Sequence, residues 1–287
     1  MATLREIKQR IKGIKNTQQI TKAMKMVAAA KMRRAQERMF AARPYADKIQ
    51  ELIQNLVSAV DESDSPFLQE REIQHVSIVV VTGDRGLCGS FNSNVIKQAI
   101  QEYDRNKDKN VSLVCVGKKG HDFFKKRDYN LSGEYPGIFN NLDFSHANEI
   151  TNRLIDDFLN GKTDAVRLIY NEFKSVARQN LVTQDILPFV QTQPEEPQET
   201  IDYLYEPSQK ALLDALLPRF IRTQVWRALL ESFASEQAAR MMAMENATDN
   251  ASELIRDLTL QYNKARQASI TKEILEIVGG AEALKNA

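Results

Sequence analysis

Cysteine and histidine are scarce in this chain of 287 residues, which contains two of the former and three of the latter. Two thiols cannot build the disulfide framework of a small secreted protein, so we expect Cys88 and Cys115 to be reduced and partly buried. His75, His121 and His146 form no pair on one helical face, and the sequence has no Cys-x-x-Cys motif. We therefore expect no metal site, and each histidine should lie at the surface or cap a helix.

Long apolar runs are also missing. The longest, residues 78–81, is far shorter than the roughly 20 residues that a bilayer-spanning helix needs. The first residues, MATLREIKQRIKG, have neither the apolar core of a secretory signal nor the Ser- and Arg-rich character of an import leader. We therefore expect the chain to stay in a cytoplasm-like compartment, where any attachment to a membrane depends on a partner.

Glycine and proline are sparse, with 11 and 8 residues, which argues against a disordered or fibrous chain. Residues 3–60 contain one of each, and their apolar residues recur every three or four positions, as in an amphipathic helix. Some 55 helical residues would run roughly 80 Å. Pro44 should bend this helix or mark a local break. The apolar stripe consists of Leu4, Ile7, Ile11, Ile14, Ile20, Met24, Val27 and Met32.

Residues 208–285 repeat the helical spacing. Pro218 should kink the early part or begin a new helix, and Gly279 with Gly280 should end it. Neither terminal helix can bury its apolar stripe alone, so we expect the two to pack antiparallel as a long coiled coil. The seam is rich in small residues, which would make a slender rod, although alanine is also simply the best helix former. These residues are Ala28, Ala29, Ala30, Ser235, Ala238, Ala239, Ala243, Ala247 and Ala251.

The middle of the chain changes period and predicts an inserted, Rossmann-like α/β domain. Its sheet should be parallel at first and antiparallel at its last edge. The last of its helices should have Ser145 as its N-cap and Gly161 after its end. We expect strands at 75–82, 111–116, 165–173 and 181–190, helices at about 93–104, 120–126 and 145–159, and a loop, QPEEPQ, at 193–198. The chain then divides into an N-terminal coiled-coil helix (1–60), an α/β foot domain (75–200) and a C-terminal coiled-coil helix (208–287).

A glycine-bearing segment, TGDRGLCGSFN at residues 82–92, follows the first expected strand, where a doubly wound fold can bind phosphate. Its glycine spacing is G-x-x-G-x-x-G instead of G-x-G-x-x-G, and no Lys-Ser/Thr pair follows. Residues 161–163, Gly-Lys-Thr, lack the upstream glycine of a P-loop. We therefore interpret residues 82–92 as a tight strand-to-helix connection and expect neither a cofactor nor a catalytic residue in this chain.

Positive charge is concentrated at the N-terminus. Residues 1–43 carry about a dozen Lys and Arg but only Glu6 and Glu37 as acids, so this arm needs an anionic partner. Nucleic acid could meet that need through its phosphates. The charges encircle the helix, however, and no aromatic residue precedes Phe40. Methionines among the charges, Met24, Met26 and Met32, favour an apolar protein surface as the partner.

The segment NTQQITKAMKMVAAAKMRR, residues 16–34, resembles the N-terminal helix of the gamma subunit of F-type ATP synthases. The C-terminal part is similar to the same family in SEQAARMMAMENATDNA (235–251), YNKARQASIT (262–271) and EIVGGA (276–281). VTGDRGLCGSFN resembles the family's first strand and turn. These matches occur in the right order at both ends and in the centre, so they cover essentially the whole chain.

The resemblance implies a non-catalytic central-stalk rotor subunit. Its coiled coil would be the axle inside a ring of three alpha and three beta subunits, and its foot domain would meet the epsilon subunit and the membrane rotor c-ring. Such a subunit couples ion-driven rotation to ATP synthesis or hydrolysis and takes part in regulating ATPase activity and proton flow. It lies peripherally on the cytoplasmic face of the bacterial inner membrane, and the resemblance implies no cofactor, metal ion, nucleic acid or small-molecule substrate.

The resemblance also implies a set of residues at the coupling interfaces. In the N-terminal helix, basic residues would face an acidic lever loop of the beta subunits, and Met24 would be a bearing position near the neck of the axle. The basic residues are Lys22, Lys25, Lys31, Arg33 and Arg34. In the C-terminal helix, a second set would couple the two helices to each other and to the ring, and residues 274–287 would reach an apolar sleeve. The second set is Arg240, Arg266, Gln267, Thr271 and Glu273.

Two other classes of protein remain open at this point. A free-standing coiled coil that binds nucleic acid through its basic arm would show salt-sensitive DNA binding without a fixed protein stoichiometry. A nucleotide-dependent enzyme built on the α/β domain would show ligand binding by the isolated chain. Neither class explains why the two terminal helices are so long.

Overall fold

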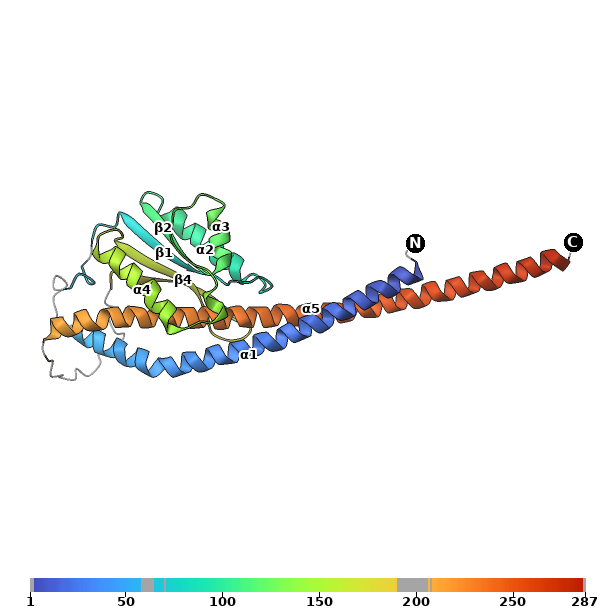
Figure 1. The fold of residues 1–287 in the computed structure, drawn as a ribbon, viewed down its shortest axis with the longest axis horizontal. Helices are drawn as coiled ribbons and strands as arrows, with labels where there is room; N and C mark the ends of the chain where they lie inside the picture. Colours follow the sequence, from blue (N-terminus) through green and yellow to red (C-terminus); the bar gives the residue numbers. More distant parts are fainter. Residues whose placement is uncertain (1–2, 58–64, 70, 190–205, 207, 286–287) are drawn as a thin grey trace. The chain divides into compact units, whose positions relative to one another are not determined.

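The computed structural model describes residues 3–57, 65–69, 71–189, 206 and 208–285. A helix stands at each end of the chain, α1 (Leu4–Val57) and α5 (Gln209–Lys285), with a sheet and shorter helices between them in sequence (Figure 1). The chain forms two compact units, and α1 and α5 each supply residues to both. The two-helix unit is Met1–Val27 with Met241–Ala287, and the α/β unit is Ala28–Arg240.

In the two-helix unit, α1 and α5 run antiparallel, which confirms the expected coiled coil. Three cross-helix pairs show the direction, because rising numbers on α1 meet falling numbers on α5. Each pair joins polar side chains. The pairs are Gln18 Nε2 with Ser252 Oγ at 2.7 Å, Thr21 Oγ1 with Thr248 Oγ1 at 2.7 Å, and Lys25 Nζ with Glu245 Oε1 at 2.5 Å. In the same unit, small and apolar side chains such as Ile7, Met244 and Ala251 are buried.

The α/β unit contains a five-stranded sheet in the order β3-β2-β1-β4-β5. Its first four strands are parallel, and β5 is antiparallel to β4 at the edge, as predicted. The strands are β1 (His75–Val81), β2 (Asn110–Val116), β3 (Leu131–Tyr135), β4 (Ala165–Phe173) and β5 (Gln179–Leu187). The helices between them are α2 (Phe91–Arg105), α3 (Lys118–Lys125) and α4 (Phe144–Leu159), with a short 3-10 turn, η2 (Ile138–Asn140).

The two faces of the sheet pack against different helices. Val76, Ile78 and Val80 of β1 belong to one apolar cluster with side chains of α2 and α3. Val79 and Val81 point the other way, into a larger cluster with α4 and the nearby parts of α1 and α5. This alternation follows from the period-two geometry of a strand, and Figure 1 shows α2 and α4 on opposite sides of the sheet.

Within the α/β unit, α5 is buried on nearly all sides between residues 221 and 240. Small residues such as Ala228, Ala234 and Ala238 are at most 1% exposed, which lets neighbouring elements approach closely. Polar side chains are buried here too, although an amphipathic helix would expose them. They are Thr223, Gln224, Glu231, Ser232, Ser235, Glu236, Gln237 and Arg240.

Several local predictions about helix ends were wrong. The N-cap of α4 is Asp143, whose carboxylate accepts the N–H of Ser145, so Ser145 lies inside the helix. Two other predictions about this helix were confirmed. His146 caps it by completing a capping box with Asp143, and Gly161 follows its end with φ +70°. The helix α5 does not stop at Gly279 and Gly280 but continues to Lys285, because glycine costs a helix only about 1 kcal/mol relative to alanine.

The two helical prolines do not interrupt their helices. Pro44 lies inside α1 without a break, and Pro218 lies inside α5, nine residues after its first residue, so it does not begin the helix. The sequence prediction missed β3 altogether. The end of the predicted last strand at residue 190 and the predicted loop at 193–198 fall outside the described residues.

Phe158 of α4 tests the packing of the larger apolar cluster. Its side chain is 0% exposed, stacks on Phe67 with ring centroids 6.5 Å apart and lies beneath the Arg71 guanidinium. We expect Phe158→Ala to lower the free energy of unfolding by about 3–5 kcal/mol, because it leaves a cavity. Urea unfolding of the full chain measures the change. Leu159→Ala, at a neighbouring position that is 44% exposed, is the control and should cost less than about 1 kcal/mol. Equal losses in the two variants would contradict the packing described.

Candidate functional site

The glycine-bearing segment 82–92 connects β1 to α2, as predicted, and its polar groups bind other parts of the chain. Thr82 Oγ1 accepts the N–H of Gly120 at 2.8 Å, at the first turn of α3. Asn92 Oδ1 accepts the N–H of Gly83 at 2.8 Å, and Asn92 Nδ2 donates to the carbonyl of Arg85 at 3.2 Å. These hydrogen bonds give the connection a fixed shape.

Asp84 anchors the same segment to two neighbouring loops. Its carboxylate accepts three backbone N–H groups, from Lys118 at 2.9 Å, Gly137 at 2.7 Å and Phe139 at 3.1 Å. Hydrogen bonds to an ionised acceptor are stronger than neutral ones. The connection is therefore held rigidly against the start of α3 and against η2.

On α5, Glu236 and Arg240 lie one helical turn apart and meet the 82–92 connection. Arg240 Nη2 lies 2.7 Å from Glu236 Oε1 and also donates to the carbonyl of Gly86 at 3.1 Å. The two side chains are only 4% and 10% exposed. Burial raises the pKa of Glu236 above its ordinary value, the Arg240 charge opposes this rise, and Asp84 adds to it.

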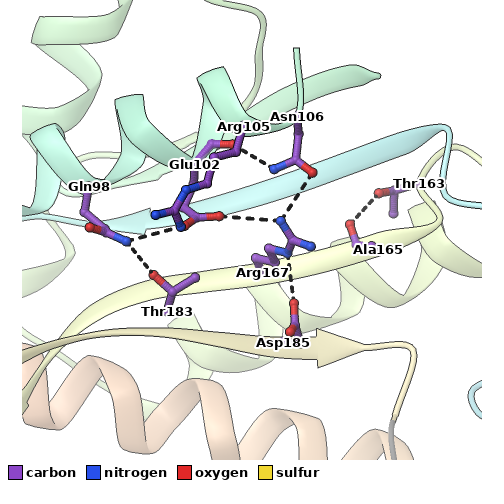
Figure 2. Close-up of polar contacts among 9 residues, drawn as sticks. All are labelled: Gln98, Glu102, Arg105, Asn106, Thr163, Ala165, Arg167, Thr183 and Asp185. Carbon is purple, nitrogen blue, oxygen red and sulfur yellow. Dashed lines mark hydrogen bonds and ion pairs between the residues drawn. The ribbon is translucent and has the colours of Figure 1, made fainter. Parts of the chain in front are cut away.

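A second polar cluster ties α2 to the β4–β5 edge of the sheet (Figure 2). Glu102 of α2, whose side chain is 7% exposed, is bound by the guanidinium groups of Arg105 at 2.6 Å and Arg167 at 3.5 Å. Arg167 also reaches Asp185 on β5 at 2.9 Å and Asn106 at 3.3 Å. Two cations compensate the buried carboxylate, so this cluster has a structural explanation.

The residues implied by the family resemblance lie in different environments. Lys22, Arg33 and Arg34 are exposed, whereas Lys31 is half-buried in the α/β unit. Within the two-helix unit, Met24 and Lys25 are half-buried, and Lys25 is paired with Glu245.

On α5, Arg240 meets the 82–92 connection. The other members on α5 are exposed, and Thr271 Oγ1 donates to the Gln267 carbonyl at 2.9 Å. These exposed members are Arg266, Gln267, Thr271 and Glu273.

Sequence reasoning did not single out Glu236 and Glu245, although each binds a residue of the predicted set. Glu236 lies four positions before Arg240, a spacing that puts opposite charges on one helical face, so this pair could have been found. Glu245 carries no such signal, because its partner is 220 residues away in the sequence.

The C-terminal part of α5 exposes large apolar side chains. In the two-helix unit, the exposed fraction reaches 71% at Ile277. Clustered apolar surface of this kind marks a site for contact with another protein. The side chains are Leu254, Leu260, Ile270, Ile274, Leu275, Ile277 and Val278.

Comparison with known proteins gives a match along nearly the whole chain. The ATP synthase family model matches residues 3–284. The ATP synthase gamma chain of Chlorobaculum parvum is 54% identical over 291 residues, covering 99% of this chain and 100% of that one. The protein of the same name from Chloroherpeton thalassium is 51% identical over 301 residues, covering 99% of each. The chain belongs to the ATP synthase gamma chain family.

Solved structures agree with this gamma chain assignment. A chain of the Tetrahymena thermophila mitochondrial ATP synthase central stalk and c-ring is 30% identical, with a TM-score of 0.63 over 79% of this chain and 99% of that one. A chain of the Euglena gracilis mitochondrial ATP synthase has a TM-score of 0.69, and the match covers 98% of this chain and 94% of that one. Its identity is 23%, so it supports the fold alone. Membership of the gamma chain family decides against the nucleic-acid-binding coiled coil and the nucleotide-dependent enzyme.

Both cysteines of this gamma chain family member are free and buried, as expected. Burial raises the pKa of Cys115 to about 12, and burial followed by the Glu236 charge raises that of Cys88. Since the thiolate is the reactive form, we expect both thiols to resist iodoacetamide at pH 8 in the folded chain and to react after unfolding in urea. Mass spectrometry of the alkylated peptides measures the rates. Equal rates in the folded and unfolded chains would contradict this prediction.

Proposed function

We propose that this chain is the central-stalk rotor subunit of an F-type ATP synthase and is not itself catalytic. It couples rotation of a membrane ring to ATP synthesis or hydrolysis on other subunits, and it takes part in regulating ATPase activity and proton flow. The observation that carries the proposal is identity of 51–54% to ATP synthase gamma chains over 99% of the chain. The antiparallel pairing of α1 and α5 is the structural feature that suits an axle.

The proposed partners are three alpha and three beta subunits, the epsilon subunit and the c-ring. The exposed apolar side chains at the end of α5 support contact with a surrounding protein sleeve. The exposed Lys22, Arg33 and Arg34 of α1 suit an acidic loop of the beta subunits. We propose the same coupling role for Lys25, Lys31 and Arg240. We also propose it for the exposed residues Arg266, Gln267, Thr271 and Glu273.

The proposed division of labour has three parts, an N-terminal axle helix (1–60), an α/β foot domain (75–200) and a C-terminal axle helix (208–287). The foot would meet the epsilon subunit and the c-ring. No helix among the described residues is long and apolar enough to cross a membrane. We propose a peripheral location on the cytoplasmic face of the bacterial inner membrane, reached through these partners.

Rotation can drive catalysis elsewhere only if the axle contacts each beta subunit differently in each orientation. A contact that stabilises one conformation over another shifts the population of that site by its difference in affinity. The bearing must not hold any one orientation too tightly, and small or flexible side chains such as Ala and Met suit this need better than large aromatic anchors.

Affinity purification tests the proposed function directly. The tagged full chain is extracted from host membranes in mild detergent, and the co-purifying proteins and ATPase activity are measured. We expect one copy of this chain with three alpha and three beta subunits and an active ATPase. Recovery of the chain alone, or with nucleic acid, would overturn the proposal.

Met24 provides a test of the bearing. The side chain is half-buried on α1, and the neighbouring Lys25 is paired with Glu245 of α5. We expect Met24→Lys to reduce ATP-driven proton pumping in membrane vesicles relative to ATP hydrolysis, because a new cation would form an ion pair at the bearing. Met24→Leu, which conserves volume without adding charge, is the control and should retain pumping. Unchanged pumping in Met24→Lys would contradict a bearing role.

A further inference from the structure

The contact between α5 and the 82–92 connection has a geometry that apolar packing does not provide. Close packing already limits the rotation of a buried helix about its own axis, but apolar contacts are non-directional and do not by themselves fix one orientation. Hydrogen bonds and close steric contacts are directional and resist such rotation. In the α/β unit, Glu236 and Arg240 supply contacts of the directional kind, and both are buried.

Gly83 lies directly against the Glu236 carboxylate. A Cβ atom at Gly83 would fall 2.8 Å from Glu236 Cδ and within 3.1 Å of both carboxylate oxygens, so a larger residue fits only if Glu236 moves. One helical turn further along α5, Arg240 donates to the carbonyl of Gly86. Two neighbouring points on the connection thus meet two consecutive turns of the same helix.

Both partners in this contact are held in place by other groups. On the connection, Asn92 fixes Gly83, and the carboxylate of Asp84 accepts three backbone N–H groups. On α5, Arg240 binds Glu236, and Ser235 Oγ donates to the carbonyl of Asn171 on β4 at 3.2 Å. Rotating this part of α5 about its axis would push Glu236 into the Gly83 backbone or break the bond from Arg240 to Gly86.

We propose that Glu236 is a positioning residue that fixes the orientation of α5 about its own axis relative to the sheet. Rotation imposed on the foot domain would then turn the axle by the same angle. The Glu236 carboxylate occupies the space that a side chain at position 83 would fill, and Arg240 holds the carboxylate there. This inference rests on the proposed rotor function. It assigns to Glu236 and Gly83 a role in transmitting torque that is distinct from contacts with the surrounding subunits.

The test uses the assembled complex in membrane vesicles, where the ratio of proton pumping to ATP hydrolysis is measured for each variant. We expect Glu236→Ala and Gly83→Ala each to lower this ratio about fivefold or more. The first variant removes the carboxylate that lies against Gly83, and the second displaces it. Glu236→Gln keeps the side-chain length and can still accept a hydrogen bond from Arg240, so it should retain the ratio. Ser90→Ala, an exposed position on the same connection, is the matched control.

A second readout separates transmission of torque from folding. With the alpha-beta ring immobilised, the thermal angular fluctuation of a bead attached to the foot reports torsional stiffness. Glu236→Ala should broaden this fluctuation at full copy number of the chain. A normal ratio and normal fluctuation in both Glu236→Ala and Gly83→Ala would overturn the proposal, as would a loss in Glu236→Gln equal to that in Glu236→Ala.

The contact itself can be tested in the free full chain by a double-mutant cycle of urea unfolding. Because the Gly83→Ala clash requires the Glu236 side chain, the double variant Gly83→Ala/Glu236→Ala should lose less stability than the sum of the single variants. Additive losses of stability would show that Gly83 and Glu236 do not interact and would overturn the proposal, even if a variant fails to assemble. Failure of the wild-type chain to co-purify with alpha and beta subunits would instead overturn the rotor function and leave this contact standing.

Discussion

The burial of α5 between residues 221 and 240 is the constraint on which the rest of the α/β unit depends. A helix enclosed on nearly all sides cannot use the usual division into an apolar and a polar face. Its buried side chains are large and apolar, such as Leu229 and Leu230, or small, such as Ala234 and Ala238, and polar ones such as Ser235 and Arg240 bind groups inside the protein. The 82–92 connection and β4 supply those partners, so the sheet and the helix specify each other.

Much of the fold could be predicted from local pattern. Short, nearly continuous apolar runs predicted β1, β2 and β4, and the long helical periods predicted α1 and α5. The strand β3 was missed because it is short and contains Gly133, which weakens the pattern of a strand. The N-cap Asp143 was missed because Ser145 lies two residues away and is an equally good candidate by residue type.

The candidate site was only partly predictable, for a different reason. Similarity to a family can point to Arg240, but the contacts that explain its position join residues far apart in sequence. Arg240 and Gly86 are separated by 154 residues, and Lys25 and Glu245 by 220. No periodicity or spacing rule reports on such pairs. Glycine at position 83 looks like an ordinary turn residue until the structure shows a carboxylate where its side chain would be.

The bare apolar end of α5 has a consequence for how a cell must make this protein. Side chains such as Ile274, Leu275 and Ile277 would stay in water on any copy without its partners. Surfaces of this kind attract chaperones and proteases and promote aggregation. Surplus copies are therefore a burden, and synthesis of this chain has to keep pace with that of the subunits proposed to cover it.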